Sequence, residues 1–216
     1  MEEIEIFDEM YNKLKPYHTS IDNIHKLGLW HQTFACWLVN KDENVIYLQL
    51  RGTKNRVGAN TFDATASGHL AFNEKIEDGF RELKEELGNN IIIFNKEYLG
   101  VFRNIFISEN YINREFCNVF IASTNSKLED FSLEAGEVYG VYKLNIEDGI
   151  NLFSNKIESV KVSGKIFKDN SYLDNTKTIS ISDFNLHDER TKISGYYLKV
   201  MIMAKRYIEG IFPNRI

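Results

Sequence analysis

One segment of the chain, residues 67–88, joins a glycine-bearing loop to a helix-forming stretch that is rich in glutamate. Glu82, Glu85 and Glu86 are spaced i, i+3 and i+4, so a helix brings their carboxylates to one face. The apolar residues of this stretch repeat at i, i+4, i+7 and i+11 and form the opposite face: Ile76, Phe80, Leu83 and Leu87. This pattern predicts a helix that buries one side in a core and turns its carboxylates toward a cleft.

The carboxylate cluster also predicts a metal site. Three neighbouring carboxylates repel one another unless a cation neutralises them. An all-oxygen ligand set favours Mg²⁺ or Mn²⁺ over zinc. Such a cation would in turn bind the oxygens of a phosphate group.

The segment resembles the Nudix box, whose pattern is G-x5-E-x7-R-E-U-x-E-E-x-G-U, where U is an aliphatic residue. Gly68 and Glu74 match the first two fixed positions, and residues 81–88 reproduce R-E-U-x-E-E-x-G. The departures are that only six residues separate Glu74 from Arg81, that Asn73 replaces a glycine, and that Asn89 replaces the last aliphatic residue. We expect the helix to start close to Asn73 or Glu74 and to absorb the shortening before Ile76, which leaves the role of Glu74 open.

The same residues also fit a solvated helix with charge pairs such as Glu77 with Arg81, ended by Gly88 as a C-cap. Residues 81–87 alone favour that alternative. The additional matches at Gly68 and Glu74, and the strand-like run before them, favour the Nudix interpretation.

The resemblance implies an α+β fold, an α/β/α sandwich with a mixed β-sheet between helices. It implies that Glu82 and Glu86 hold the metal with the Gly68 carbonyl, and that Glu85 completes a second ion or orients water. Glu115 is expected to be a further ligand or the general base, since Nudix enzymes often take that group from outside the box.

Three further residues are expected to bind substrate. Arg51 and Lys54, at a strand end and in the following loop, are predicted to clamp phosphate oxygens, although ordinary surface charge is an equal alternative for Lys54. His69, beside Gly68, is predicted to contact substrate. The predicted activity is Mg²⁺-dependent hydrolysis of a diphosphate linkage in a nucleoside diphosphate derivative or a related small organic diphosphate.

A second resemblance reaches beyond the box, to the Nudix branch that contains type 1 isopentenyl-diphosphate isomerase. It covers roughly the first two thirds of the chain and includes residues 25–31, 49–51 and 115–120. In that isomerase, histidines and glutamates hold a metal, and a cysteine two residues before a histidine transfers protons. The matching positions in this chain are His25, His31, His69 and Glu115 for the metal, Ser67 for the cysteine, and Asn113 for another glutamate.

Ser67 makes isomerisation the second choice, because a hydroxyl is far less acidic than a thiol. For His25 and His31, hydrogen-bonded structural histidines near the sheet edge are at least as good an interpretation as metal ligands. A third alternative is a nucleotide-binding Nudix module without turnover. The intact Glu82, Glu85 and Glu86 argue against that module.

Composition limits the kinds of partner that the protein is expected to bind and its expected location in the cell. The chain of 216 residues, 43% of them hydrophobic, can bury a full core. A net charge of −5 argues against a nonspecific nucleic-acid surface. No targeting pattern and no apolar run of about 20 residues is present, which predicts a cytoplasmic protein without a membrane span. Cys36 and Cys117 are expected to be buried thiols, and the oligomeric state stays open.

The chain is expected to form one domain, with residues 1–29 as an extension bearing a short strand at 3–8, residues 30–155 as the core, and residues 156–216 as an extension that ends in an amphipathic helix. A connection with turns is expected at 11–27, and a helix at 146–153. Strands are predicted at 33–39, 45–51, 91–94, 98–107, 115–122 and 138–144. Residues 156–184 fit either an irregular insertion or short strands, and Gly210 and Pro213 are expected to stop the last helix.

Overall fold

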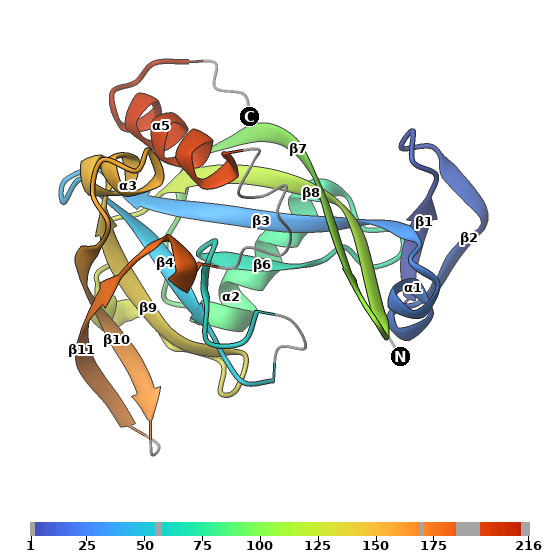
Figure 1. Ribbon diagram of the computed structural model, residues 1–216, viewed down its shortest axis with the longest axis horizontal. Helices are drawn as coiled ribbons and strands as arrows, with labels where there is room; N and C mark the ends of the chain where they lie inside the picture. Colours follow the sequence, from blue (N-terminus) through green and yellow to red (C-terminus); the bar gives the residue numbers. More distant parts are fainter. Residues whose placement is uncertain (1–2, 55–57, 169–170, 185–194, 213–216) are drawn as a thin grey trace.

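A computed structural model describes residues 3–54, 58–168, 171–184 and 195–212 of the chain (Figure 1). The helices are α1 (Ile21–Leu27), α2 (Arg81–Leu87), α3 (Ile146–Phe153) and α5 (Tyr196–Ile208), with 3₁₀ turns η1 (Ile76–Phe80), η2 (Leu128–Asp130) and η3 (Ile181–Asp183). The strands are β1 (Glu3–Phe7), β2 (Lys13–Ser20), β3 (Trp30–Asn40), β4 (Val45–Arg51), β5 (Phe62–Asp63), β6 (Ala66–His69), β7 (Phe94–Ser108), β8 (Tyr111–Ser123), β9 (Val138–Asn145), β10 (Val160–Lys168) and β11 (Ser171–Ile179).

The sheet is mixed because β3 pairs with β8 in parallel, whereas the other strand pairs are antiparallel. Its main path runs β11-β10-β9-β4-β3-β1-β2, and β8 joins β3 and carries β7. β3 and β4 pair only at Val39–Ile46 and Asn40–Val45. The short strands β6 and β5 then pair with β3 and β4 respectively, so the two long strands are joined directly only at one end.

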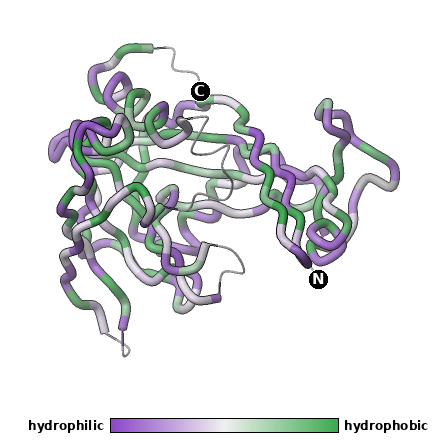
Figure 2. The backbone as a smooth tube through the Cα atoms, in the orientation of Figure 1, coloured by the Kyte–Doolittle hydropathy of each residue, from purple (hydrophilic) through white to green (hydrophobic). Residues whose placement is uncertain are grey.

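Helices cover both faces of this sheet, which confirms the predicted α/β/α sandwich. On one face Phe80, Leu83 and Leu87 pack in a core with Phe34 and Tyr47. On the other face α5 contributes buried side chains to a second core, Val200, Met201, Ala204 and Tyr207. Figure 2 shows hydrophobic and hydrophilic residues alternating along α5, as its amphipathic pattern predicted. Cys36 is buried, Cys117 is partly buried, and both are free thiols.

Most strand and helix predictions agree with the structure, and β4 and α3 have the predicted bounds. The predicted connection at 11–27 is wrong, because β2 and α1 occupy it. A separate strand at 91–94 is also wrong, since β7 begins only at Phe94. Of the two alternatives for 156–184, the strands are correct, as β10 and β11 pair along their whole lengths. Helix α5 ends at Ile208 before Gly210, and Pro213 lies outside the described residues.

The predicted start of the box helix is wrong. The helical turn begins at Ile76 as a 3₁₀ turn, and α-helical geometry begins only at Arg81. A Cβ on Gly79 would lie 2.4 Å from Cγ of Phe34, so this turn sits directly on β3. The close packing accounts for the glycine, and the tighter 3₁₀ geometry spans the shortened stretch between Glu74 and Arg81.

We predict that Leu83→Ala lowers the free energy of unfolding by about 2–5 kcal/mol, because Leu83 is 2% exposed in the core beneath α2. Urea denaturation gives the value. The exposed neighbour Lys84 is the control, and Lys84→Ala should change stability by less than about 0.5 kcal/mol. Equal, small effects of both changes would show that α2 is not anchored by its apolar face.

Candidate active site

Gly68 and Glu82 approach each other closely at the point where β6 faces α2. A Cβ on Gly68 would lie 2.1 Å from Oε1 of Glu82, so any larger residue would displace this carboxylate from its position. Gly68 is held in place by its pairing with Phe34 of β3. The predicted metal ligands Gly68 and Glu82 are therefore side by side, and the carboxylate faces the strand backbone rather than bulk solvent.

Arg81 connects the loop, the strand and the helix. Its Nε donates to Glu74 at 2.7 Å, and its Nη1 donates to Glu82 at 2.6 Å and to Glu85 at 2.8 Å. Its Nη2 donates to the His69 carbonyl at 2.9 Å. These contacts raise the pKa of Arg81. The hydrogen bond from Arg81 also holds the pKa of Glu74 below its usual range. Glu74 is thus placed as an anchor for Arg81.

Glu86 is the most deeply buried carboxylate of the box, at 8% exposure. Its Oε2 accepts hydrogen bonds of 3.0 Å from the Ser67 backbone and from Nε2 of Gln49. Burial and the nearby charge of Glu82 raise the pKa of Glu86 to about 8, although its hydrogen bonds and Arg51 act in the opposite direction. Two carboxylates in this position are a ready site for a cation, which would remove the mutual repulsion.

Glu85 differs from these two, because 56% of its side chain is exposed and it pairs with Arg81. It still lines the same cavity as Glu82 and Glu86. The predicted convergence is therefore closest for Glu82 and Glu86, while Glu85 lies at the rim.

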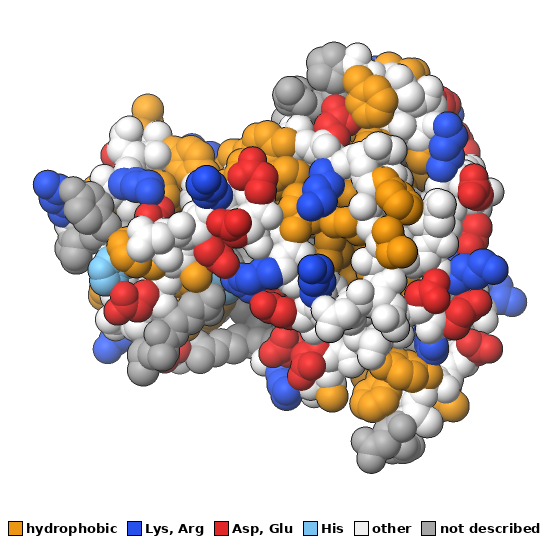
Figure 3. All heavy atoms as spheres, turned by 180° about the vertical axis from the view of Figure 1, so that it is seen from behind, with side chains coloured by type: hydrophobic (Ala, Val, Ile, Leu, Met, Phe, Trp, Pro, Cys, Tyr) orange, Lys and Arg blue, Asp and Glu red, His pale blue; other side chains and the backbone are white. Residues whose placement is uncertain are grey.

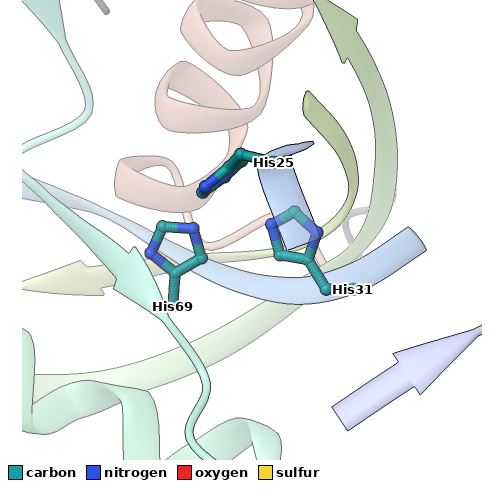
Figure 4. A group of neighbouring side chains, drawn as sticks. All are labelled: His25, His31 and His69. Atoms are coloured by element: carbon teal, nitrogen blue, oxygen red, sulfur yellow. The ribbon is translucent and has the colours of Figure 1, made fainter. Parts of the chain in front are cut away.

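Three histidines from separate elements converge on one point (Figure 4). His25 comes from α1, His31 from β3 and His69 from β6, and one ligand nitrogen of each lies within 4.8 Å of the others. Nδ1 of His31 lies 3.1 Å from the Leu29 carbonyl and can donate to it, which leaves Nε2 as the acceptor. Burial lowers the pKa of His31, and burial together with His31 lowers that of His69 to about 3, so both rings are neutral at pH 7.

Acceptor atoms surround this histidine cluster. Glu115 is the register partner of His31, and it accepts a hydrogen bond of 2.9 Å from Nδ2 of Asn104. Nε2 of His31, Nε2 of His69, and Oδ1 of Asn104 and Asn113 are among the buried polar atoms that have no hydrogen-bond partner within the described ranges. Imidazole nitrogens this close to one another, with a carboxylate beside them, suit a divalent transition metal.

One cavity of about 560 Å³ is lined by the box carboxylates and by His25 and His69 of the histidine cluster. It brings together every predicted site residue: Arg51, Lys54, Gly68, His69, Glu82, Glu85, Glu86 and Glu115. It also includes residues that the sequence did not predict, among them Asn104, Asp63, Tyr111, Tyr196 and Tyr197. Arg51 lies 3.6 Å from Asp63, which fixes its position at the cavity wall. Asn104, Tyr111, Tyr196 and Tyr197 are far from the box in sequence, and Asp63 precedes it outside the motif, so spacing alone gave no signal for them.

A mixed sheet between helix layers, with a carboxylate-bearing helix facing a glycine strand, is the arrangement that the resemblance to the Nudix family implies. No profile of a known protein family matches the chain. An uncharacterized Nudix hydrolase of Clostridium acetobutylicum is 33% identical over 204 residues, which cover 93% of this chain and 95% of the relative. The chain therefore belongs to the Nudix hydrolases and is a Nudix-type hydrolase.

A solved structure of low sequence identity supports the fold. The crystal structure of DR0079 from Deinococcus radiodurans superposes with a TM-score of 0.54 at 15% identity, covering 71% of this chain and 90% of that one. A MutT Nudix hydrolase from Burkholderia pseudomallei has a TM-score of 0.45 at 18% identity, with 55% and 84% covered.

We predict that the histidine cluster binds Co²⁺, used as a visible probe, and that His31→Asn weakens this binding at least tenfold. Titration followed by the d–d absorption of the ion gives the affinity. His18→Asn is the control, because His18 pairs with Glu3 outside the cavity lining. If His31→Asn titrates like the unchanged protein, the histidines do not form a metal site.

Proposed function

We propose that this hydrolase is Mg²⁺-dependent, with Mn²⁺ as the alternative ion, and that it cleaves a diphosphate linkage in a nucleoside diphosphate derivative or a related small organic diphosphate. The observation that carries the proposal is the placement of buried Glu86 and Glu82 against the Gly68 strand. Two carboxylates side by side in the lining of one cavity form an oxygen-rich site that fits a hard cation.

The residues of the box and those around it have separate roles in this reaction. Glu82, Glu86 and the Gly68 carbonyl would hold the ion, and Arg81 keeps the carboxylates in position. When bound, Mg²⁺ lowers the pKa of coordinated water and offsets the charge of the phosphates. Arg51 and Lys54, on the cavity wall, are placed to bind phosphate oxygens. Water adds to one phosphorus, the bridging P–O bond breaks, and two phosphate-bearing products leave.

Glu115 is our candidate for the general base or an additional metal ligand. It lies next to His31 across the parallel strands and is oriented by Asn104. A base in this place would accept the proton that water loses as it attacks. A second cation, held by the histidines, would have access to the same cavity.

The histidine cluster also favours one alternative function, an isomerase-like activity on an organic diphosphate. What supports it is that the three histidines lie within ligand distance of one another and that Glu115 is the register partner of His31. Ser67 and Asn113 argue against it, because neither is an acid strong enough to protonate an alkene. The catalytically silent module is disfavoured by the intact carboxylates that line the cavity.

Partners and location follow as predictions. The substrate is a small molecule that fits the cavity. Acidic and basic side chains are interspersed on the face shown in Figure 3, which suits a protein that does not bind nucleic acid. Within the described ranges, no helix is long and apolar enough to cross a membrane. The cytoplasmic location and the domain boundaries remain predictions.

We predict that Glu82→Gln and Glu86→Gln each keep the fold and lose at least 90% of Mg²⁺-dependent turnover, since a neutral amide binds a divalent cation far more weakly than a carboxylate. Phosphate release from a panel of nucleoside diphosphate derivatives measures the activity, and circular dichroism checks the fold. Glu77→Gln, an exposed change outside the cavity lining, should leave turnover within about twofold. Full activity in both box variants would refute the metal assignment.

The isomerase alternative has its own test. Isopentenyl diphosphate incubated with the enzyme in deuterated water should acquire no deuterium, because Ser67 has no acidic proton to exchange at carbon. Mass spectrometry of the recovered diphosphate measures incorporation. Enzyme-dependent deuterium in the product would place the isomerase above the hydrolase.

A further inference from the structure

The register of three neighbouring strands divides the cavity floor into two rows. His31, Glu115 and Asn104 are successive partners across β3, β8 and β7 and form a polar row. Two residues further along β3, the partners are Thr33, Cys117 and Phe102. Side chains two residues apart share a face, so the rows lie about 7 Å apart along the strands. Glu115 and Asn104 of the first row and all three residues of the second row line the same cavity.

The second row is largely apolar, and the start of α5 continues it. The ring of Phe102 lies 4.4 Å from that of Tyr196, centroid to centroid. Tyr196 is held by a hydrogen bond of 3.2 Å that Nε1 of Trp37 donates to its hydroxyl. Tyr197, the next residue, is stacked on Phe153 at 5.2 Å. Aromatic surfaces that are fixed by other contacts recognise a ligand at low cost in conformational entropy.

A charged pair lies at the Tyr197 end of this aromatic wall. Asp63 accepts a hydrogen bond of 3.4 Å from the Tyr197 hydroxyl and lies 3.6 Å from Arg51. Lys54 and the box carboxylates line other parts of the cavity. Burial keeps the pKa of Tyr196 and Tyr197 well above its ordinary value, so both phenols are neutral. A cavity of about 560 Å³ is of the size that holds a drug-sized ligand rather than a diphosphate alone.

We infer that Phe102 and Tyr196 form a subsite for the organic group of the substrate, and that this group is a planar aromatic ring. The inference rests on the proposed diphosphate substrate and extends it, since it specifies what the diphosphate is attached to. The ring lies against the edges and faces of the aromatic wall, one row away from the histidines and Glu115. Aromatic contacts of this kind favour a flat ring over a saturated group of equal size.

Binding is tested without turnover by isothermal titration calorimetry in Mg²⁺, with three non-cleavable methylene-bridged diphosphonates that carry a phenyl, a cyclohexyl or a methyl group. We expect the phenyl compound to bind at least tenfold more tightly than the methyl compound, and severalfold more tightly than the cyclohexyl compound. Phe102→Ala should remove most of the preference for phenyl and leave the affinity for the methyl compound within about twofold. Phe102→Tyr, which keeps an aromatic ring, should show the preference for phenyl again.

Phe94→Ala is the matched control, because Phe94 is in the same strand but exposed and outside the cavity lining. Equal affinity for the three compounds, or a phenyl preference unchanged in Phe102→Ala, overturns the subsite. An equal preference for phenyl and cyclohexyl assigns an apolar site and overturns the aromatic class. Phosphate release from phenyl diphosphate separately tests the hydrolase. A preference for the ring without cleavage refutes only the proposed function. Cleavage without a preference for the ring refutes only the subsite.

Discussion

The arrangement of the site depends on a single guanidinium group. Arg81 binds Glu74 before the helix, Glu82 and Glu85 on the helix, and the carbonyl of His69 on β6. Without a positive charge in this position, the carboxylates would repel one another and spread into solvent. A planar fork can satisfy several acceptors in fixed directions, which the point charge of lysine does not do. The same group therefore offsets part of the negative charge of the box and connects the helix to the strand.

Strand β6 allows the two halves of the site to share one cavity. Gly68 faces Glu82 of the box, and the next residue, His69, belongs to the histidine cluster. Adjacent residues in a strand point to opposite faces, so a single short strand serves both groups of ligands. The limited pairing between β3 and β4 leaves the opening in which β6 lies. The carboxylates of the box and the imidazoles of the histidine cluster prefer different cations. Strand β6 thus brings these two groups of ligands close to each other.

Local sequence patterns correctly predicted those helices and strands whose structure depends mainly on their own residues. The apolar stripe of α2 and the buried runs of β3 and β4 were correct for this reason. The strand β2 was missed because its described side chains are largely exposed and polar, so it has no buried alternation. The 3₁₀ turn was missed because the contact between Gly79 and Phe34 is tertiary. In the site, spacing found the box, whereas Asn104 and Tyr196 enter through strand register and helix packing, which no local pattern reveals.

Helix α1 ends at Gly28, whose φ of 64° and close approach to Ile112 of β8 suit only glycine. The Gly28 carbonyl also accepts a hydrogen bond from Arg114, 86 positions further along the chain. The segment that supplies His25 is therefore fixed by residues that leave the ribosome much later. Contacts of such long sequence separation form slowly, because the entropy of closing the loop is lost before they stabilise the chain. During synthesis, the box helix can form while the histidine cluster is still incomplete, so the cluster is complete only after β8 has joined the sheet.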